Sequence, residues 1–151
     1  MNIALKFTNK NACRKIGWDR KTQADDIATG HCQFVAEVQD GFRYWDADDL
    51  TAGQFYIDGR KAGLTVKLSG IAASRLRRGM RNHPTADQLT VVTLENGSTS
   101  ILPTATLDLS SGFVSGGYVA TATMIDVRNL RARIQRAIDA DAAIIGGDDE
   151  G

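Results

Sequence analysis

The densest group of chemically active side chains in the sequence is the segment Gly70–His83, which reads GIAASRLRRGMRNH. It contains several arginines and no carboxylate. Arginine presents a planar fork of donors that binds phosphate or carboxylate oxygens in pairs. We therefore treat this region as a candidate surface for a phosphate backbone or an acidic partner. The candidate basic surface consists of Arg60, Lys61, Lys67, Arg75, Arg77, Arg78 and Arg81.

The same segment has the periodicity of a helix. Its apolar residues fall within about a 100° arc at 100° per residue, and the arginines take much of the opposite side. A surface helix that docks by this stripe and leaves its arginines in solvent explains the pattern as well as a binding face does. A third interpretation is that the arginines meet the aspartate-rich block 40–58 of a neighbouring copy. The apolar stripe consists of Ala72, Ala73, Leu76 and Met80.

Three nearby carboxylates, Asp46, Asp48 and Asp49, have the oxygen chemistry that hard cations prefer. The same residues also fit a capped helical turn. Asp46 is suited to the N-cap, Asp49 to the third helical position, and Gly53 to the end of the turn. Because a capped turn explains all of these residues, we assign no metal site and no cofactor.

Four side chains could act as soft metal ligands or as a nucleophile with its base: Cys13, His31, Cys32 and His83. Their spacing does not match the paired ligands of zinc sites. His31 and Cys32 are adjacent, so on a strand they would point to opposite faces. No local pattern supports a Cys–His catalytic pair. The sequence therefore predicts no catalytic residue and favours a non-enzymatic protein.

Bulk composition is ordinary for a globular protein, with 42% hydrophobic and 24% charged residues. The formal net charge is zero, which argues against a protein that coats nucleic acid by bulk charge but not against a local basic surface. A chain of 151 residues is expected to form one domain. We place this single α+β domain at 1–145 and a flexible acidic tail at 146–151.

The N-terminal residues lack the pattern of a signal peptide, and no apolar run is long enough to span a bilayer. We therefore expect a cytoplasmic protein with reduced cysteines and no membrane contact.

The segment 97–125 is unusually poor in charge, since Asp108 is its only charged residue. It alternates small polar residues with apolar ones, as a strand-rich region does. Edge strands are usually protected by charge, and charged residues are depleted at the cores of interfaces. We refer to 97–125 as the charge-poor segment and expect its β surface to be covered by another subunit, although a sheet with a Ser- and Thr-rich outer face is the alternative.

Alternation and turn residues predict a largely antiparallel sheet. The hairpin signals are Asp40-Gly41 and Asn96-Gly97. Aromatic residues on both faces of 42–45 predict that this strand is covered on both sides. Asp126 is a suitable N-cap for a C-terminal amphipathic helix. The predicted strands are 2–7, 32–38, 42–45, 54–57, 64–68, 89–94, 98–109 and 118–125, with a short helix ending at Ile27.

The predicted fold is therefore α+β: a mainly antiparallel sheet of hairpins, with a mid-chain basic helix and a C-terminal amphipathic helix packed on it. We expect a non-enzymatic assembly or interaction subunit that self-associates through the charge-poor β surface, of the kind found in virions and mobile elements. The alternative is a nucleic-acid-binding accessory protein that uses the arginine-rich helix on nucleic acid or another polyanion. The expected partners are a second copy of the chain or another protein.

Overall fold

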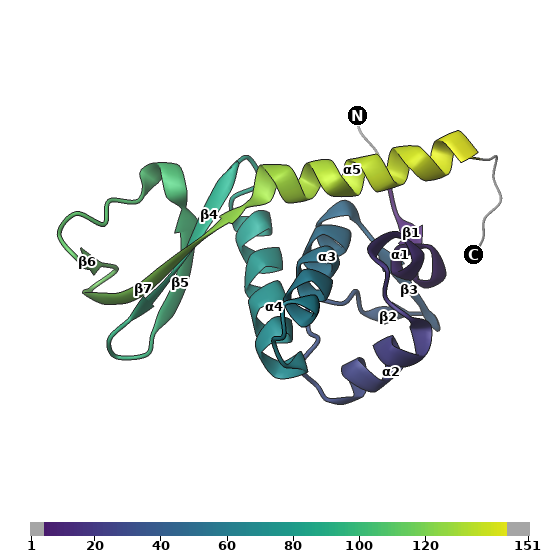
Figure 1. Cartoon of the computed structure of the whole chain (residues 1–151), viewed down its shortest axis with the longest axis horizontal. Coiled ribbons are helices and arrows are strands. Elements are labelled where there is room, and N and C mark those ends of the chain that lie inside the picture. Colours follow the sequence, from purple (N-terminus) through teal and green to yellow (C-terminus); the bar gives the residue numbers. More distant parts are fainter. Residues whose placement is uncertain (1–4, 145–151) are drawn as a thin grey trace. The chain divides into compact units, whose positions relative to one another are not determined.

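The computed structural model describes residues 5–144, with side chains described as far as residue 141 (Figure 1). The acidic tail predicted at 146–151 and the first residues of the strand predicted at 2–7 lie outside this range. The chain forms two compact units, one of residues 1–77 and 130–151 and the other of 78–129. The boundaries fall within the helices α4 (Val66–Asn82) and α5 (Val127–Ile144), and each unit is described by itself.

The first unit begins with two short helices, α1 (Asn9–Ile16) and α2 (Arg20–Ala28). Thr8 caps α1 by accepting a hydrogen bond from the Asn11 N–H at 3.2 Å. Gly17 ends α1 in the left-handed region with φ of 75°, a conformation that glycine adopts without strain. The Asp19 side chain then caps α2 by accepting from the Thr22 N–H at 3.1 Å. The predicted short helix is therefore present, but it begins at Arg20 and is capped by Asp19.

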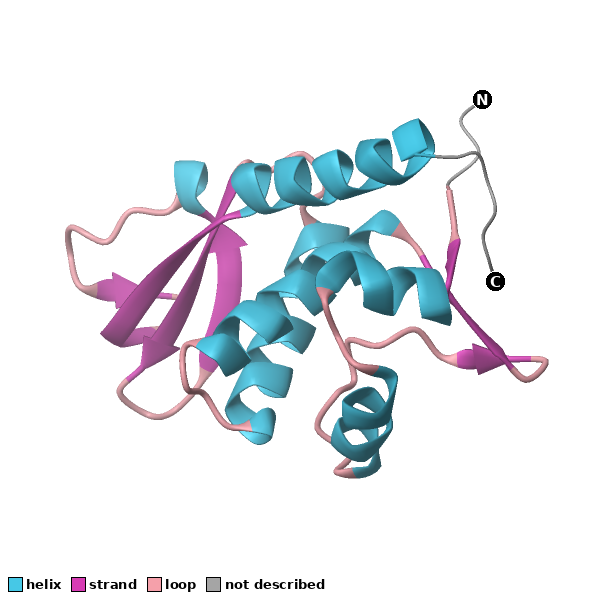
Figure 2. Cartoon of the chain, turned by 45° about the vertical axis from the view of Figure 1, so that its right-hand side comes forward, coloured by secondary structure: helices cyan, strands magenta, loops and turns pink. Residues whose placement is uncertain are grey.

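A small antiparallel sheet follows, with the strand order β1-β3-β2 (Figure 2). Its strands are β1 (Phe7–Thr8), β2 (Val38–Gln39) and β3 (Phe42–Trp45). Asp40 and Gly41 both have positive φ, as the predicted tight hairpin turn requires. The strand predicted at 32–38 is wrong except at Val38, and the rest of the stretch is irregular. Phe34, Val35 and Ala36 are all buried in succession, so burial does not alternate as in a strand with one exposed face.

The core of the first unit is an aromatic cluster around one buried carboxylate. The ring of Tyr56 lies 5.1 Å from that of Trp18 and 4.9 Å from that of Phe34. Asp26 accepts hydrogen bonds from the Tyr56 hydroxyl at 2.7 Å and the Trp18 Nε1–H at 3.3 Å. Burial, together with the hydrogen bond to Asp26, raises the pKa of Tyr56 above its usual range. The hydroxyl therefore stays protonated and keeps its role as a donor.

The strands predicted at 54–57 and 64–68 are wrong, because 54–57 lies within a helix and 66–68 begins α4, while Leu64 and Thr65 are irregular. Helix α3 (Ala47–Lys61) begins with a capping box between Asp46 and Asp49, which confirms the predicted cap. Gly53 does not end the helix. It lies where an added Cβ would come within 3.1 Å of the Trp45 ring, so it permits a close approach instead.

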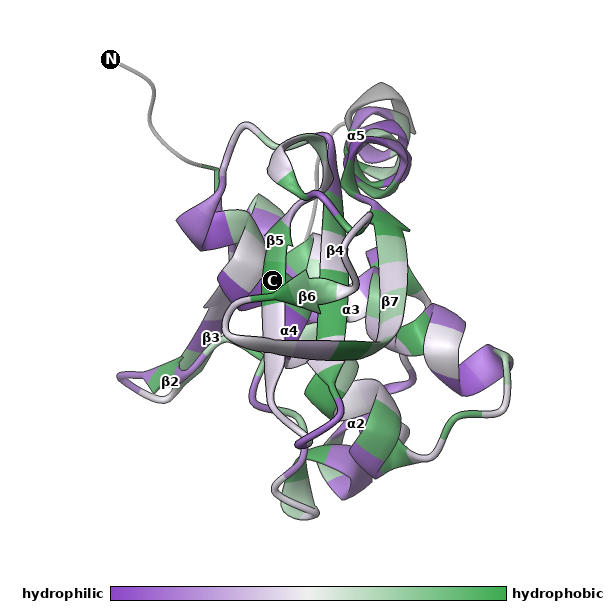
Figure 3. Cartoon of the chain, turned by 90° about the vertical axis from the view of Figure 1, so that its left-hand side faces the viewer, coloured by the Kyte–Doolittle hydropathy of each residue, from purple (hydrophilic) through white to green (hydrophobic). Residues whose placement is uncertain are grey.

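The second unit is a four-stranded antiparallel sheet of order β5-β4-β7-β6 (Figure 3). The turn predicted at Asn96-Gly97 is confirmed by the positive φ of Gly97 and by its N–H donating to the Leu94 carbonyl at 2.9 Å. The strand predicted at 98–109 ends early at Pro103, where a 3-10 turn follows (Thr104–Thr106). The strands are β4 (Gln88–Leu94), β5 (Thr99–Pro103), β6 (Phe113–Val114) and β7 (Gly117–Asp126).

The predicted α+β class is confirmed, with antiparallel sheets, a mid-chain basic helix and a C-terminal helix. Asp126 caps α5 as expected, since its side chain accepts from the Asn129 N–H at 3.0 Å. Leu130 and Ile134, four residues apart on α5, are both buried, as expected for one face of an amphipathic helix.

We expect Gly70→Ala to destabilise the protein. A Cβ at Gly70 would collide with the backbone carbonyl of His31, which cannot move as a flexible side chain would. Helix propensity alone predicts a gain of about 1 kcal/mol, whereas the collision should reduce the free energy of unfolding by about 1–3 kcal/mol. Urea unfolding measures the difference, with the exposed Lys67→Ala of the same helix as the control. An increase in stability for Gly70→Ala would show that the two backbones are not this close.

Candidate nucleic-acid interface

The predicted basic surface does not behave as a set of free cations. Arg77 lies with its Nε atom 2.8 Å from the carboxylate of Asp49, whose side chain is only 4% exposed. The Nε–H makes no hydrogen bond, so this contact is an ion pair, and the guanidinium donates instead to the Gln33 carbonyl at 3.2 Å. Arg77 therefore neutralises a buried charge of its own chain.

The remaining residues of the candidate surface are divided between the two units. In the first unit, Arg60 donates to the Leu64 carbonyl at 2.8 Å, while Lys61 and Lys67 are exposed. Arg75 is half-buried in the same unit. The exposed residues Arg78 and Arg81 belong to the second unit.

The aspartate-rich block meets arginines within the same chain. The Arg133 guanidinium donates two hydrogen bonds to the Asp58 carboxylate, at 2.5 and 3.1 Å. The Arg131 guanidinium lies 3.7 Å from the Asp48 carboxylate. Burial opposes ionisation of Asp58, but the hydrogen bonds and charge of Arg133 outweigh it and hold the pKa of this carboxyl below its usual value. These carboxylates are thus paired without a neighbouring copy.

The two cysteines among the candidate soft ligands are buried and carry raised pKa values. Cys13 and Cys32 are buried free thiols. Burial raises the pKa of Cys13 to about 11 and also raises that of Cys32, so both remain protonated near neutral pH. Among residues 5–144, no group of three or more His, Cys, Asp or Glu side chains is placed to hold a metal ion.

A different basic surface lies beside the β2–β3 hairpin of the first unit. It is a groove of about 580 Å³, which we call the hairpin groove. Its cations are Lys10, Arg20 and Arg43, and none of its described lining residues is acidic. The lining consists of Thr8, Asn9, Lys10, Arg20, Val38, Gly41, Phe42, Arg43 and Tyr44.

Two exposed aromatic rings border the hairpin groove. Phe42 is 63% exposed and Tyr44 is 43% exposed, and their ring centroids lie 6.2 Å apart. The prediction that this strand is covered on both sides is therefore wrong, because only Trp45 turns inward. Cations that bind phosphates, combined with aromatic faces that contact bases or sugars, are the elements of a nucleic-acid surface.

The groove is framed by α1, α2 and the hairpin, because each of these elements contributes lining residues. The connection between α1 and α2 consists of Gly17, Trp18 and Asp19. In its length and its glycine it is like the turn of a helix-turn-helix, which has three or four residues and often contains glycine. Arg20 and Lys21 stand exposed at the start of α2, the second helix.

Sequence reasoning missed this site because its residues come from three separate segments. The available signal was the excess of basic residues in 1–21, of which Asp19 is the only acidic member. Joining this signal to 38–44 requires the pairing of β1 with β3, which aligns Thr8 with Tyr44.

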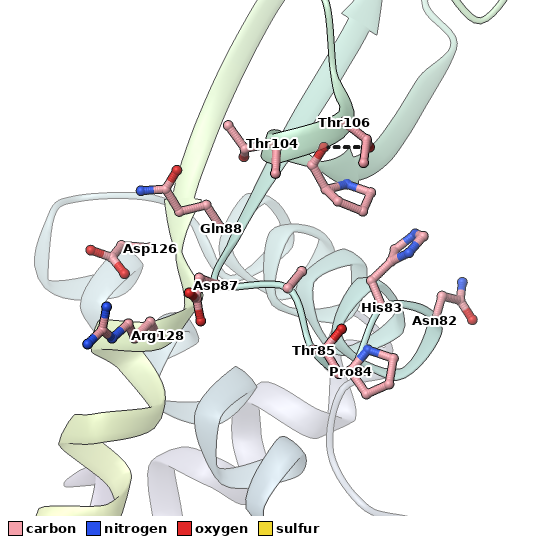
Figure 4. Close-up of a pocket in the computed structure, with 13 residues that line it drawn as sticks. Asn82, His83, Pro84, Thr85, Asp87, Gln88, Thr104, Thr106, Asp126 and Arg128 are labelled. Atoms are coloured by element: carbon pink, nitrogen blue, oxygen red, sulfur yellow. Dashed lines mark hydrogen bonds between the residues drawn. The ribbon is translucent and has the colours of Figure 1, made fainter.

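The second unit has a polar pocket of about 810 Å³, lined in part by Asp87, Asp126 and Arg128 (Figure 4). His83 stands on the opposite side of this pocket in the same view. Several of its polar groups serve the local backbone: the Asp126 side chain caps α5, and the Asp87 carbonyl accepts from the Arg128 N–H at 2.9 Å. The arrangement therefore explains local structure better than it indicates a ligand.

No protein-family model matches the chain, and no curated protein sequence matches it either. Within the described part of the chain, none of the helices has the length and apolar character needed to cross a membrane.

We expect the Arg133–Asp58 pair to stabilise the protein in a pH-dependent way. Because the folded pKa of Asp58 is lowered, its contribution is present above the pKa of the unfolded chain, about 3.9, and is lost as the pH falls through the folded value. Arg133→Gln should therefore reduce stability at pH 7 by no more than about 1 kcal/mol, since both partners are partly exposed.

The difference from the wild type should then shrink on acidification, as measured by urea unfolding at a series of pH values. The exposed Arg136→Gln of the same helix is the control. A deficit for Arg133→Gln that stays constant down to pH 3 would show that ionised Asp58 is not its partner.

Proposed function

We propose that this chain is a non-enzymatic protein that binds double-stranded DNA through the hairpin groove and the α1–α2 pair. The observation that carries the proposal is the joining of Lys10, Arg20 and Arg43 with exposed Phe42 and Tyr44 around a helix-turn-helix pattern. The cations supply contacts to phosphates, and the helix pair supplies an element that fits a groove of the duplex.

The short second helix, α2, is the element that would enter the major groove. In helix-turn-helix proteins the N-terminal residues of the second helix contact base edges, and the first helix crosses the backbone. Arg20 and Lys21 lie at the N-terminal end of α2, and Lys10 lies at the start of α1. The β2–β3 hairpin then contacts the flanking backbone with Arg43, Phe42 and Tyr44.

The predicted arginine-rich surface is the less favoured site for the same ligand. Arg77 is committed to the buried Asp49. Arg60 donates to the Leu64 carbonyl, but Arg43 of the hairpin groove likewise donates to the Ala36 carbonyl, so this bond does not distinguish the two sites. The zero net charge of the chain agrees with one local basic surface rather than a generally basic molecule. The hairpin groove places cations and aromatic rings together, which the arginine-rich helix does not.

Removing cations from one surface at a time shows which of the two surfaces binds the duplex. Lys10→Ala and Arg20→Ala should each weaken binding to a labelled duplex and reduce the slope of log affinity against log salt by about one. Lys61→Ala and Lys67→Ala should leave both quantities unchanged. Fluorescence anisotropy across a salt series measures them. The reverse result would assign binding to the arginine-rich surface, and loss of affinity in none of the variants would sink the proposal.

Phe42→Ser tests the aromatic part of the same site. Because Phe42 is exposed, its loss should leave folding intact while it removes contact with bases or sugars. We expect the dissociation constant to rise, with the salt slope unchanged because no charge is lost. Stacking of a ring on an unpaired base contributes about 1–3 kcal/mol, so about five- to 160-fold is the upper range for a single-stranded probe. Anisotropy with duplex and single-stranded probes measures the effect. An unchanged affinity for the duplex would exclude Phe42 from the interface, and tighter binding to the single strand would change the ligand class.

Self-association through the charge-poor segment is the second candidate. The observation that favours it is strand β7 (Gly117–Asp126), of which most residues are exposed. This role is compatible with DNA binding, because many helix-turn-helix proteins act as dimers.

A further inference from the structure

One edge of the second unit's sheet is open along most of its length. Strand β7 pairs with β4 from Gln88↔Asp126 to Leu94↔Val119 on its inner side. On its outer side only Gly117 and Tyr118 pair with β6. Within the described residues of this unit, the outer edge from Ala120 to Asp126 thus has no strand partner.

The side chains along this open edge are exposed on both faces of the strand. All residues from Ala120 to Met124 are exposed, and Met124 is 52% exposed. A strand that packs on a core by one face would instead alternate between buried and exposed positions. Both faces of β7 are therefore accessible to a neighbour.

This edge has little of the protection that exposed edges usually have, since its one irregularity lies near its start, where the register shifts between Thr121 and Val119. No charged residue occurs in β7 before Asp126, and Figure 3 shows the strand in pale and green shades. The opposite edge strand, β5, is half-buried and ends at Pro103, which has no N–H to offer. Native proteins normally protect an open edge with charge, proline or a bulge, because unpaired backbone groups recruit another strand.

We propose that β7 pairs antiparallel with β7 of a second copy, so that two four-stranded sheets form one continuous sheet across a twofold axis. The axis passes beside Ala122, which faces its own counterpart. Thr121 then lies opposite Thr123 of the second copy, within the part of β7 whose pairing with β4 is regular. This is an isologous interface, in which the same strand serves both subunits.

The sequence of β7 suits a copy of itself better than another partner. Cross-strand Thr–Thr pairs stabilise a sheet, and like charges opposite each other destabilise it. A twofold pairing brings the same short segment of both copies together, so a strand without charges in 120–125 avoids this repulsion. An acidic or basic partner would require complementary charge, which 120–125 does not contain. The inference does not depend on DNA binding.

Ala122→Lys and Ala122→Glu form a charge-swap test of the proposed axis. Size-exclusion chromatography with light scattering should give twice the 16.3 kDa chain mass for the wild type and for the control Ala122→Ser. Each charged variant alone should be monomeric, because two like charges face each other at the axis. An equimolar mixture of the two should recover the dimer. Circular dichroism checks that each variant is folded.

Ala122→Cys provides a second readout that does not rely on repulsion. Directly opposed residues of an antiparallel pair have Cα atoms about 4.5 or 5.5 Å apart, within the range of a disulfide. Mild oxidation should therefore link this variant into a covalent dimer, whereas the buried native thiols should not link the wild type. Ser98→Cys, an exposed position outside β7, is the control and should remain monomeric on a denaturing gel.

Three outcomes would overturn the proposal. They are a wild type that stays monomeric at every concentration tested, a dimer that survives both charged substitutions, and a mixture of the charged variants that stays monomeric. The test is separate from that of DNA binding, because Lys10→Ala and Arg20→Ala should remain dimeric. A monomeric wild type that binds DNA would overturn this inference alone.

Discussion

The ion pair between Asp49 and Arg77 is the constraint on which the first unit depends. Asp49 serves the capping box of α3, yet its side chain is almost wholly buried. A buried carboxylate without a partner is strongly destabilising, and Arg77 of α4 supplies the compensating charge. The helix start and the packing of two helices are therefore coupled. Near the other end of α3, Arg133 of α5 pairs with Asp58 through two hydrogen bonds.

In the aromatic cluster a buried carboxylate is also paired, but its donors are uncharged side chains instead of an arginine. Asp26 accepts hydrogen bonds from Trp18 and Tyr56, whose rings lie 5.1 Å apart in the core. The Asn9 and Gln23 side chains exchange two hydrogen bonds at 3.0 and 2.8 Å, and the Trp45 Nε1–H donates to Asn9 at 3.0 Å. Each buried polar group thus ties α1, α2 or β3 to the core, and these are the elements that line the hairpin groove. Asn9, Gln23 and Trp45 therefore support the surface proposed for DNA through hydrogen bonds, whereas the buried Oδ1 of Asn11 in α1 accepts none.

Features that depend on local chemistry could be predicted from the sequence. The turns at Asp40-Gly41 and Asn96-Gly97 require positive φ, and the caps at Asp46 and Asp126 need only neighbouring backbone groups. The helices at 54–61 and 66–68 could not be separated from strands in the same way. Their apolar residues are so few that alternation and a helical stripe fit equally well. Tertiary packing of α3 and α4 decided between them.

The candidate site was harder to predict because charge in a sequence does not reveal its partner. The run from Arg60 to Arg81 suggested one surface, but Arg77 turned inward to Asp49 while Arg78 and Arg81 belong to the other unit. The cations of the hairpin groove are modest in number and scattered between residues 10 and 43. Only the folded arrangement of α1, α2 and the hairpin collects them. Charge density along the chain was therefore a poorer guide than placement.

Because the first unit is built from two separate parts of the chain, the two units are completed in a different order from that in which they begin. The first unit is discontinuous, since residues 78–129 of the second unit separate its two parts. The ion pair of Asp58 cannot form until Arg133 has been synthesised, 75 residues later in the chain. A ribosome therefore releases the whole four-stranded sheet before the last helix of the first unit exists. The second unit can collapse from local hairpins while the first is still incomplete, so the part of the chain begun first is the part completed last.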